Sequence, residues 1–200
     1  MEPDLENKPT PKEKILQATF EIIGSKGVQA VTTRKIAAKA EVNVAAVNYY
    51  FGSKDNVINE ALKIFTNKLM SPYRHLDDTT LPPVERLRNF LRSYADSTLE
   101  YPDVFQNFIE QVMRHSDLSF EYIEFLKKIG WEKLERLIQD ITLAQDEEDV
   151  LRMKIFQMFS SLEFPVLIGV EMETLSQFDY YDRECRYKYV DLVLKALLSH

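Results

Sequence analysis

Apolar residues recur at spacings of three and four along almost the whole chain, which is the period of one face of an α-helix. Ile15, Ala18 and Ile22 are the first clear example. No window shows the strict alternation of apolar and polar residues that is typical of a half-buried strand. Five glycines and eight prolines among 200 residues are too few for a turn-rich sandwich or barrel. We therefore expect an all-α protein.

Composition excludes several other classes of protein. With 45% hydrophobic and 28% charged residues, the chain has the balance of an ordinary globular protein. Its longest nearly unbroken apolar stretch, Phe164–Val170, falls far short of the roughly 20 residues of a membrane span. The first residues are acidic and lack the apolar core of a secretory signal, so we expect a cytoplasmic location. A single cysteine, Cys185, and three scattered histidines predict no disulfide, no metal and no cofactor.

Charge is unevenly distributed along the chain. The net charge is −7, which by itself argues against binding to nucleic acid. Residues 10–56, however, hold seven basic and four acidic side chains, a balance of +3, which leaves −10 for the rest. A mildly basic N-terminal part therefore precedes an acidic body, and this asymmetry alone does not decide the function.

Capping signals delimit the first helix. Residues 1–9 are polar and are expected to form a frayed tail. Thr10 and Glu13 have the spacing of a capping box, and Pro11 occupies the first helical position, where its missing N–H costs nothing. Gly27 is expected to end this helix.

Two short helices and the start of a fourth helix should follow. The second should begin after Thr32 or Thr33, and the third should follow a break near Val42 and Asn43 and end at Gly52. Ser53 is placed to cap the fourth helix. The residues expected to face inward are Ile36, Ala37, Ala40, Val44, Val47 and Phe51.

The remainder of the chain predicts further helices separated by prolines and polar breaks. Pro82-Pro83 and Pro102-Asp103 each stand at the start of an amphipathic pattern, and Gly130 interrupts the helical pattern of residues 119–143. Pro165 must kink or end the helix expected over residues 146–173. Asp179 is expected to cap the last helix. One face of that helix should carry Cys185, Tyr189, Leu192, Val193 and Ala196.

Two short helices joined by a tight turn, on a capped first helix, are the layout of a helix-turn-helix DNA reader. A helix enters the major groove only if its outer side chains are small or polar. Ala45, Ala46, Asn48 and Tyr49 lie outside the expected inward stripe. Asn48 is suited to paired hydrogen bonds with adenine, the alanines to contact with a thymine methyl group, and Lys54 to phosphate.

At these positions the sequence resembles the TetR family of bacterial transcriptional regulators. The resemblance covers residues 10–65, and the matching text is Thr32–Ala40, Val42 and Val47–Lys54. It implies a three-helix DNA-binding domain over residues 10–55 and a helical effector-binding and dimerisation domain over residues 56–200. DNA contacts carried over from the family are Thr33, Arg34, Val44, Ala45, Ala46, Asn48, Tyr49, Tyr50 and Lys54. Glu41 departs from the family's turn glycine, Asn48 from a frequent tyrosine and Tyr50 from a frequent histidine.

The resemblance also places an effector pocket among the helices between residues 56 and 143 and a dimer contact on the last two helices. Because the first region is rich in aromatic residues, we expect a hydrophobic or aromatic small-molecule ligand. The predicted ligand-binding residues are Phe65, Phe90, Tyr94, Phe105, Phe108, Tyr122, Phe125 and Trp131. The predicted dimer interface comprises Ile155, Phe159, Leu162, Tyr189, Val193 and Leu197.

The sequence thus predicts a homodimeric, ligand-responsive transcriptional regulator, a repressor, that binds a palindromic DNA operator. Two alternatives stay open. One is a helical ligand-binding or scaffold protein without sequence-specific DNA binding, which the acidic body and Glu41 favour. The other is a small enzyme in the C-terminal bundle, but the phosphate-loop, His-Glu-x-x-His and Gly-x-Ser-x-Gly motifs are absent, so we expect no enzyme.

Overall fold

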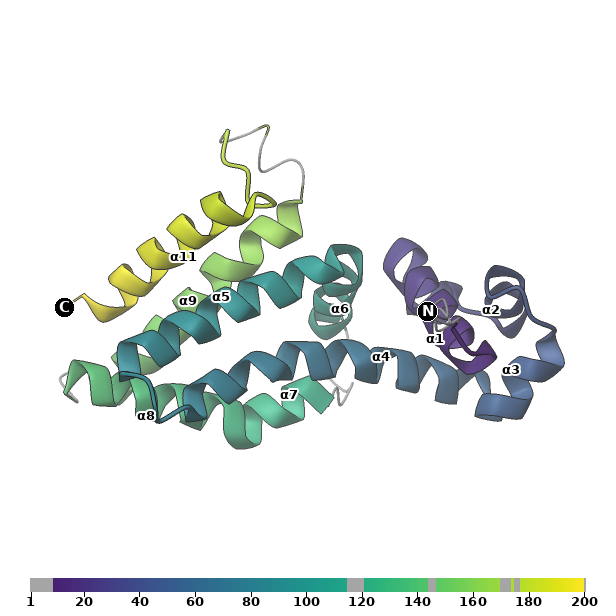
Figure 1. Ribbon diagram of the computed structural model, residues 1–200, viewed down its shortest axis with the longest axis horizontal. Helices are drawn as coiled ribbons and strands as arrows, with labels where there is room; N and C mark the ends of the chain where they lie inside the picture. Colours follow the sequence, from purple (N-terminus) through teal and green to yellow (C-terminus); the bar gives the residue numbers. More distant parts are fainter. Residues whose placement is uncertain (1–8, 115–120, 144–146, 170–173, 175–176, 200) are drawn as a thin grey trace, which may run out of the picture. The chain divides into compact units, whose positions relative to one another are not determined.

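A computed structural model describes residues 9–114, 121–143, 147–169, 174 and 177–199, and throughout these ranges the regular elements are helices (Figure 1). The all-α class predicted from the sequence is confirmed. None of the helices in these ranges is both long and apolar enough to cross a membrane. The chain divides into two compact units, Met1–Phe65 and Thr66–His200, with the division inside one helix.

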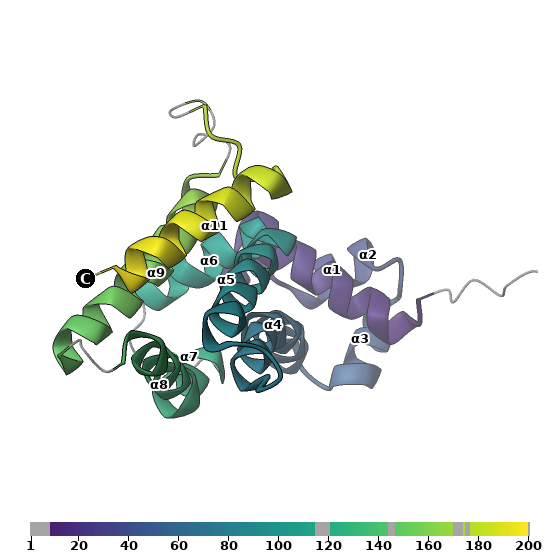
Figure 2. The same ribbon diagram turned by 60° about the vertical axis from the view of Figure 1, so that its left-hand side comes forward.

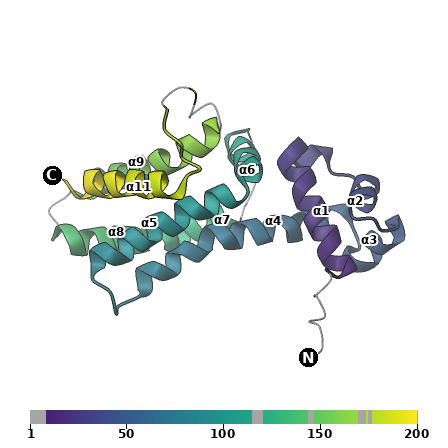
Figure 3. The same cartoon turned by 45° about the horizontal axis from the view of Figure 1, so that its top comes forward.

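The N-terminal unit contains three helices and the start of a fourth. They are α1 (Pro11–Lys26), a 3-10 turn (Val28–Ala30), α2 (Thr33–Lys39), α3 (Val44–Phe51) and the first part of α4 (Lys54–Met70). α1 contacts both α2 and α3, and α2 contacts α3 (Figure 3). Side chains from all four helices form a common core that includes Ile15, Ile36, Val47 and Val57.

The predicted helix signals of this unit are confirmed. The Thr10 hydroxyl accepts a hydrogen bond from the Glu13 N–H at 3.2 Å, and the Glu13 carboxylate accepts one from the Thr10 N–H at 2.7 Å. Thr32 caps α2 and Asn43 caps α3, each by accepting from a backbone N–H three residues later. The Ser53 hydroxyl accepts from a backbone N–H in the first turn of α4. These contacts span three residues of sequence, so they form wherever the helix forms.

The turn between α2 and α3 adopts a left-handed conformation at a residue with a side chain. Glu41 has φ of 55°. This region of backbone space suits glycine, because a Cβ crowds the following carbonyl oxygen there. The family's frequent glycine at this position therefore has a physical reason, and Glu41 leaves the turn mildly strained.

Replacing Glu41 with glycine is expected to stabilise the protein. Relief of the left-handed strain should outweigh the greater flexibility of glycine in the unfolded chain, for a net gain of about 0.5–1 kcal/mol. Urea unfolding followed by circular dichroism measures this gain. The control is Glu60→Gly, at an exposed position inside α4, which should lose about 1 kcal/mol because glycine weakens a helix interior. An unchanged or lower urea midpoint for Glu41→Gly would contradict the strain.

The C-terminal unit is a helical bundle built around α5. Its elements are a 3-10 helix (Ser71–Asp77), α5 (Pro83–Glu100), α6 (Pro102–Arg114), α7 (Glu121–Phe125), a π-helical segment (Leu126–Gly130), α8 (Trp131–Thr142), α9 (Glu148–Ile168) and α11 (Arg183–Leu198). α5 contacts α6, α8, α9 and α11, and α9 lies beside α11 (Figure 2). The prolines at 83 and 102 begin α5 and α6, as predicted.

The sequence predicted interruptions of helices at Gly130 and Pro165, and the structure shows what each of these residues does. The stretch around Gly130 is helical on both sides of the π-helical segment, and a Cβ at Gly130 would lie 2.8 Å from the Phe125 ring. Only glycine fits this close approach without movement of the ring. Pro165 does not end α9 at once, since the helix continues to Ile168 and ends at Gly169, where φ is 65°. The remainder of the helix expected over residues 146–173 lies outside the described residues.

The predicted cap of the last helix is wrong, and the apolar face predicted for this helix is not its buried face. Asp182, not Asp179, caps α11 and accepts from the Cys185 N–H at 2.7 Å, whereas Asp179 accepts from two backbone N–H groups of the preceding loop. The buried face of α11 carries Arg186, Val190, Leu194 and Leu197, while Leu192 is 65% exposed. Sequence reasoning looked for an unbroken apolar face and so could not assign a charged residue to the interior.

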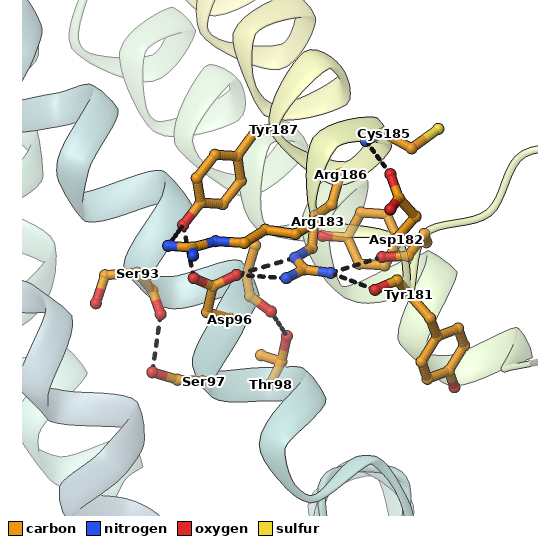
Figure 4. A network of polar contacts seen from close by, with 12 residues as sticks. Ser93, Asp96, Ser97, Thr98, Tyr181, Asp182, Arg183, Cys185, Arg186 and Tyr187 are labelled. Atoms are coloured by element: carbon orange, nitrogen blue, oxygen red, sulfur yellow. Dashed lines mark hydrogen bonds and ion pairs between the residues drawn. The ribbon is translucent and has the colours of Figure 1, made fainter.

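Arg186 is buried because its charge is neutralised there. Its guanidinium donates to Oδ1 of Asp96 on α5 at 2.7 Å and 3.0 Å, and also to the carbonyl oxygens of Tyr180 and Tyr181 (Figure 4). The Tyr187 hydroxyl donates to the other Asp96 oxygen at 2.7 Å. This network joins the first turn of α11 to α5.

Candidate nucleic-acid interface

α3 has one buried side and one exposed side. Val47 and Phe51 are buried within the N-terminal unit, at 1% and 7% exposure. Ile36, Ala37 and Ala40 of the preceding segment are buried as well, as predicted. Packing through these side chains fixes the rotation of α3 about its axis, and therefore which of its residues face outward.

The outward side of α3 presents the residues predicted to contact DNA. Asn48 and Ala45 are exposed, Ala46 is half-buried, and Tyr49 is 83% exposed. Tyr49 and Tyr50 pack edge to face, with ring centroids 5.2 Å apart. This surface combines small side chains, an amide and two phenol groups, which suits entry into a major groove and contact with base edges.

Val44 was predicted both in the inward stripe and as a DNA contact, and the inward placement is wrong. It is 40% exposed. It is the first residue of α3, directly after the capping Asn43, and the buried residues of this helix are Val47 and Phe51. Its role as a DNA contact stays a prediction.

Side chains suited to phosphate contacts lie in the helices before and after α3, namely at the start of α2 and at the start of α4. Arg34 is exposed and Thr33 half-buried in the first turn of α2, where helix N–H groups favour an anion. Lys54 opens α4 and is exposed, with its Nζ 3.8 Å from the Asp55 carboxylate. Lys39 instead forms an ion pair with Glu21 at 2.8 Å, and this contact holds the pKa of the Glu21 carboxyl below its usual value.

All nine predicted DNA contacts therefore belong to the N-terminal unit, and each has an at least partly exposed side chain. Their arrangement can place an amide, phenol groups and cations against a polyanion. It offers no pairing of nucleophile and base that would suggest catalysis.

The residues predicted to bind a ligand are mostly core residues. Phe65 is fully buried and belongs to the N-terminal unit, where its ring lies 6.3 Å from that of Phe20. In the C-terminal unit the rings pack against one another, with centroid distances of 5.9 Å for Phe90–Tyr94 and 5.2 Å for Tyr94–Phe159. Phe105 and Phe108 are buried, Phe125 and Trp131 are half-buried, and the Tyr122 side chain lies outside the described residues.

Sequence reasoning missed a carboxyl group within this ring cluster. The Tyr94 hydroxyl donates to Oε1 of Glu163 on α9 at 2.6 Å. Burial raises the pKa of Glu163, and the hydrogen bond from Tyr94 opposes part of that rise. The available signal was a single acidic residue in the apolar segment 162–168.

Four of the six predicted dimer contacts are buried within one protomer, and the dimer interface stays a prediction. Ile155, Phe159, Leu162 and Leu197 are between 0% and 9% exposed within one protomer, because α5 and α8 pack against this side of α9 and α11. They contribute to the core of the bundle within one protomer. Tyr189 and Val193 are half-buried, and Tyr189 donates to the Ser161 carbonyl oxygen at 3.0 Å.

The opposite side of α9 carries exposed apolar side chains that the sequence reading did not identify. Their exposed fractions reach 69% for Met153, 69% for Phe156 and 56% for Phe164. Leu192 adds a further exposed apolar side chain on α11. Large exposed apolar side chains on one side of a helix, as on α9, are typical of a protein–protein contact.

The N-terminal unit matches a known family of DNA-binding proteins. The model of bacterial regulatory proteins of the tetR family matches residues 15–61. The HTH-type transcriptional repressor KstR2 of Mycolicibacterium smegmatis is 28% identical over 131 residues, which cover 64% of this chain and 63% of that protein. The HTH-type transcriptional regulator BetI of Stenotrophomonas maltophilia is 32% identical over 92 residues, 46% of this chain and 47% of the relative. The chain therefore matches less than two thirds of the length of these relatives.

Solved structures extend the similarity of fold beyond residue 61. A mutant of HlyIIR has a TM-score of 0.69 at 22% identity, and the match covers 95% of this chain and 98% of that chain. PfmR, a TetR family transcriptional regulator from Thermus thermophilus, has a TM-score of 0.65 at 19% identity, over 90% and 97% of the two chains. At these identities the comparison establishes the fold.

Proposed function

We propose, since the chain belongs to the tetR family of bacterial regulatory proteins, that it is a DNA-binding transcriptional regulator and not an enzyme. The observation that carries this proposal is the orientation of α3. Its apolar side, with Val47 and Phe51, is buried, and its other side presents Asn48 and Tyr49 to solvent. All residues of α3 lie within residues 15–61, the range that the family model matches.

The proposed roles of the exposed residues follow from their chemistry. Asn48 reads a base edge through its amide, and Ala45 allows close approach to the groove. Tyr49 and Lys54 contact the phosphate backbone, together with Arg34. Val44, Ala46, Tyr50 and Thr33 complete the proposed contact surface.

The regulator acts as a homodimer on a palindromic operator. One recognition helix reads too few base pairs to select a site, whereas a two-fold dimer reads two half-sites about 34–36 Å apart or a multiple of one turn. We place the dimer contact on the exposed apolar side of α9, with Met153, Phe156 and Phe164, and on Leu192 of α11. This surface replaces the buried residues predicted from the sequence.

A small molecule held in the C-terminal unit tunes DNA binding. The support for this proposal is the ring cluster around Tyr94 and Phe159, which offers apolar contacts beside one carboxyl group. A ligand alters operator affinity only through a difference in its affinity for the two states of the protein. A 100-fold change needs about 2.7 kcal/mol of such difference.

Selection of bound sequences from a random DNA pool tests the proposed DNA-binding function. We expect a two-fold symmetric sequence to be enriched and to be protected as two half-sites in a footprint. Binding that loses all sequence preference and disappears as salt rises would contradict the regulator and support a scaffold protein instead.

A further inference from the structure

Among the residues that the structure describes, Glu163 is a carboxyl group without a neighbouring cation. It lies on α9, and its hydrogen-bond partner is the hydroxyl of Tyr94, a residue with 0% exposure on α5. No basic side chain of the described residues forms an ion pair with it. Acidic side chains withdrawn from water are normally paired with a positive charge, because an isolated carboxylate loses hydration without compensation.

The surroundings of Glu163 are aromatic. Phe159 lies one helical turn earlier on α9, and its ring is 5.2 Å from that of Tyr94. Phe90 stacks beside Tyr94 at 5.9 Å, and Trp131 stacks on Phe159 at 6.4 Å. The faces of such rings carry partial negative charge and attract a cation within about 6 Å of the ring centre.

Glu163 also keeps some contact with solvent. Its side chain is only partly buried, and Trp131 at the other end of the cluster is partly exposed. A partly exposed carboxyl group and the partly exposed Trp131 therefore adjoin a cluster whose other rings, Tyr94 and Phe159, are buried, and both the carboxylate and the ring faces favour positive charge.

We propose that the effector is an organic cation with an apolar body, whose charge lies against the Glu163 carboxylate and whose apolar part lies among the rings of Tyr94, Phe159 and Trp131. This inference rests on the proposed effector response and names its ligand class. A neutral ligand of the same shape gains the ring contacts but leaves the carboxylate uncompensated. An anion is repelled by both features.

The test uses two probes of nearly equal shape that differ in charge, phenyltrimethylammonium and tert-butylbenzene. Trp131 is the only tryptophan in the sequence, and its contact with Phe159 makes its fluorescence a reporter of this site. In the full-length protein we expect phenyltrimethylammonium to bind at least 10-fold more tightly than tert-butylbenzene. Equal affinity for the two probes, or no saturable change with either, would overturn the proposal.

The variant Glu163→Gln tests whether the preference for phenyltrimethylammonium over tert-butylbenzene depends on this carboxyl group. The amide oxygen still accepts from the Tyr94 hydroxyl, so the packing of α5 on α9 is kept while the charge is removed. We expect the two probes to bind this variant within 2-fold of each other. Glu148→Gln, a carboxylate on the exposed first turn of α9, is the matched control and should keep the 10-fold preference. Retention of the preference in Glu163→Gln would overturn the proposal.

Two further measurements keep the result interpretable. If Glu163→Gln fails to fold, as judged by circular dichroism, the comparison of the two probes on the wild-type protein still decides the ligand class. Operator binding measured without ligand tests the DNA-binding function by itself. Failure of the charge preference in a protein that binds its operator would therefore reject the cation and leave the regulator standing.

Discussion

A protein carrying Phe156→Lys and Phe164→Lys is expected to be a monomer that binds its operator at least 100-fold more weakly than the wild type. Both phenylalanines are exposed in one protomer, so lysine is tolerated in the folded chain. In the proposed dimer the same positions are covered, and two ammonium groups from each protomer would lose their hydration without a partner. A monomer also holds only one of the two half-sites, and a 100-fold loss corresponds to about 2.7 kcal/mol.

Multi-angle light scattering measures the oligomeric state, and fluorescence anisotropy with the selected operator measures the affinity. Ile129→Lys is the control, because Ile129 is also exposed in the C-terminal unit, at 46%, but lies on the π-helical segment. This control should remain a dimer with unchanged operator affinity. A double variant that is still dimeric would exclude this side of α9 as the interface.

A lysine introduced into the interface predicted from the sequence would have a different effect from the two lysines at Phe156 and Phe164. Leu197 is 4% exposed in the protomer, so a lysine there would disrupt the core of the bundle rather than a contact between protomers. Loss of DNA binding by such a variant would not distinguish a monomer from an unfolded protein. The exposed phenylalanines separate these two effects.

The second large effect is expected for Asn48→Ala. If the Asn48 amide forms two hydrogen bonds with adenine, its removal should cost about 1–3 kcal/mol on the selected operator and relax the sequence preference at one position of each half-site. Selection from the random DNA pool, repeated with the variant, measures that relaxation. Stability should change little because the side chain is exposed.

Lys54→Ala is the matched comparison for Asn48→Ala. Lys54 is also exposed, but its proposed contact is a phosphate, so its removal should weaken binding to all sequences alike. The slope of log affinity against log salt concentration should become shallower by about 1 for each phosphate interaction removed. An Asn48→Ala protein with the same uniform weakening would show that Asn48 does not read a base.

The sequence by itself determined the helices of the N-terminal unit. The capping box of Thr10 and Glu13, the caps at Thr32 and Asn43 and the helix end at Gly52 all depend on contacts between residues at most five apart. Such contacts form within one helix turn and need no partner from elsewhere in the chain. The family resemblance was visible for the same reason, because its motif is local.

Only the tertiary structure decided which sides of α9 and α11 are buried. Both helices have apolar residues on more than one side, so periodicity alone could not separate Ile155 and Leu162 in the core from Phe156 on the surface. Arg186 is buried because Asp96, ninety residues earlier, supplies its counter-charge. Glu163 meets Tyr94 across sixty-nine residues of sequence. Burial and pairing of this kind depend on which helices pack together, and the local sequence does not contain that information.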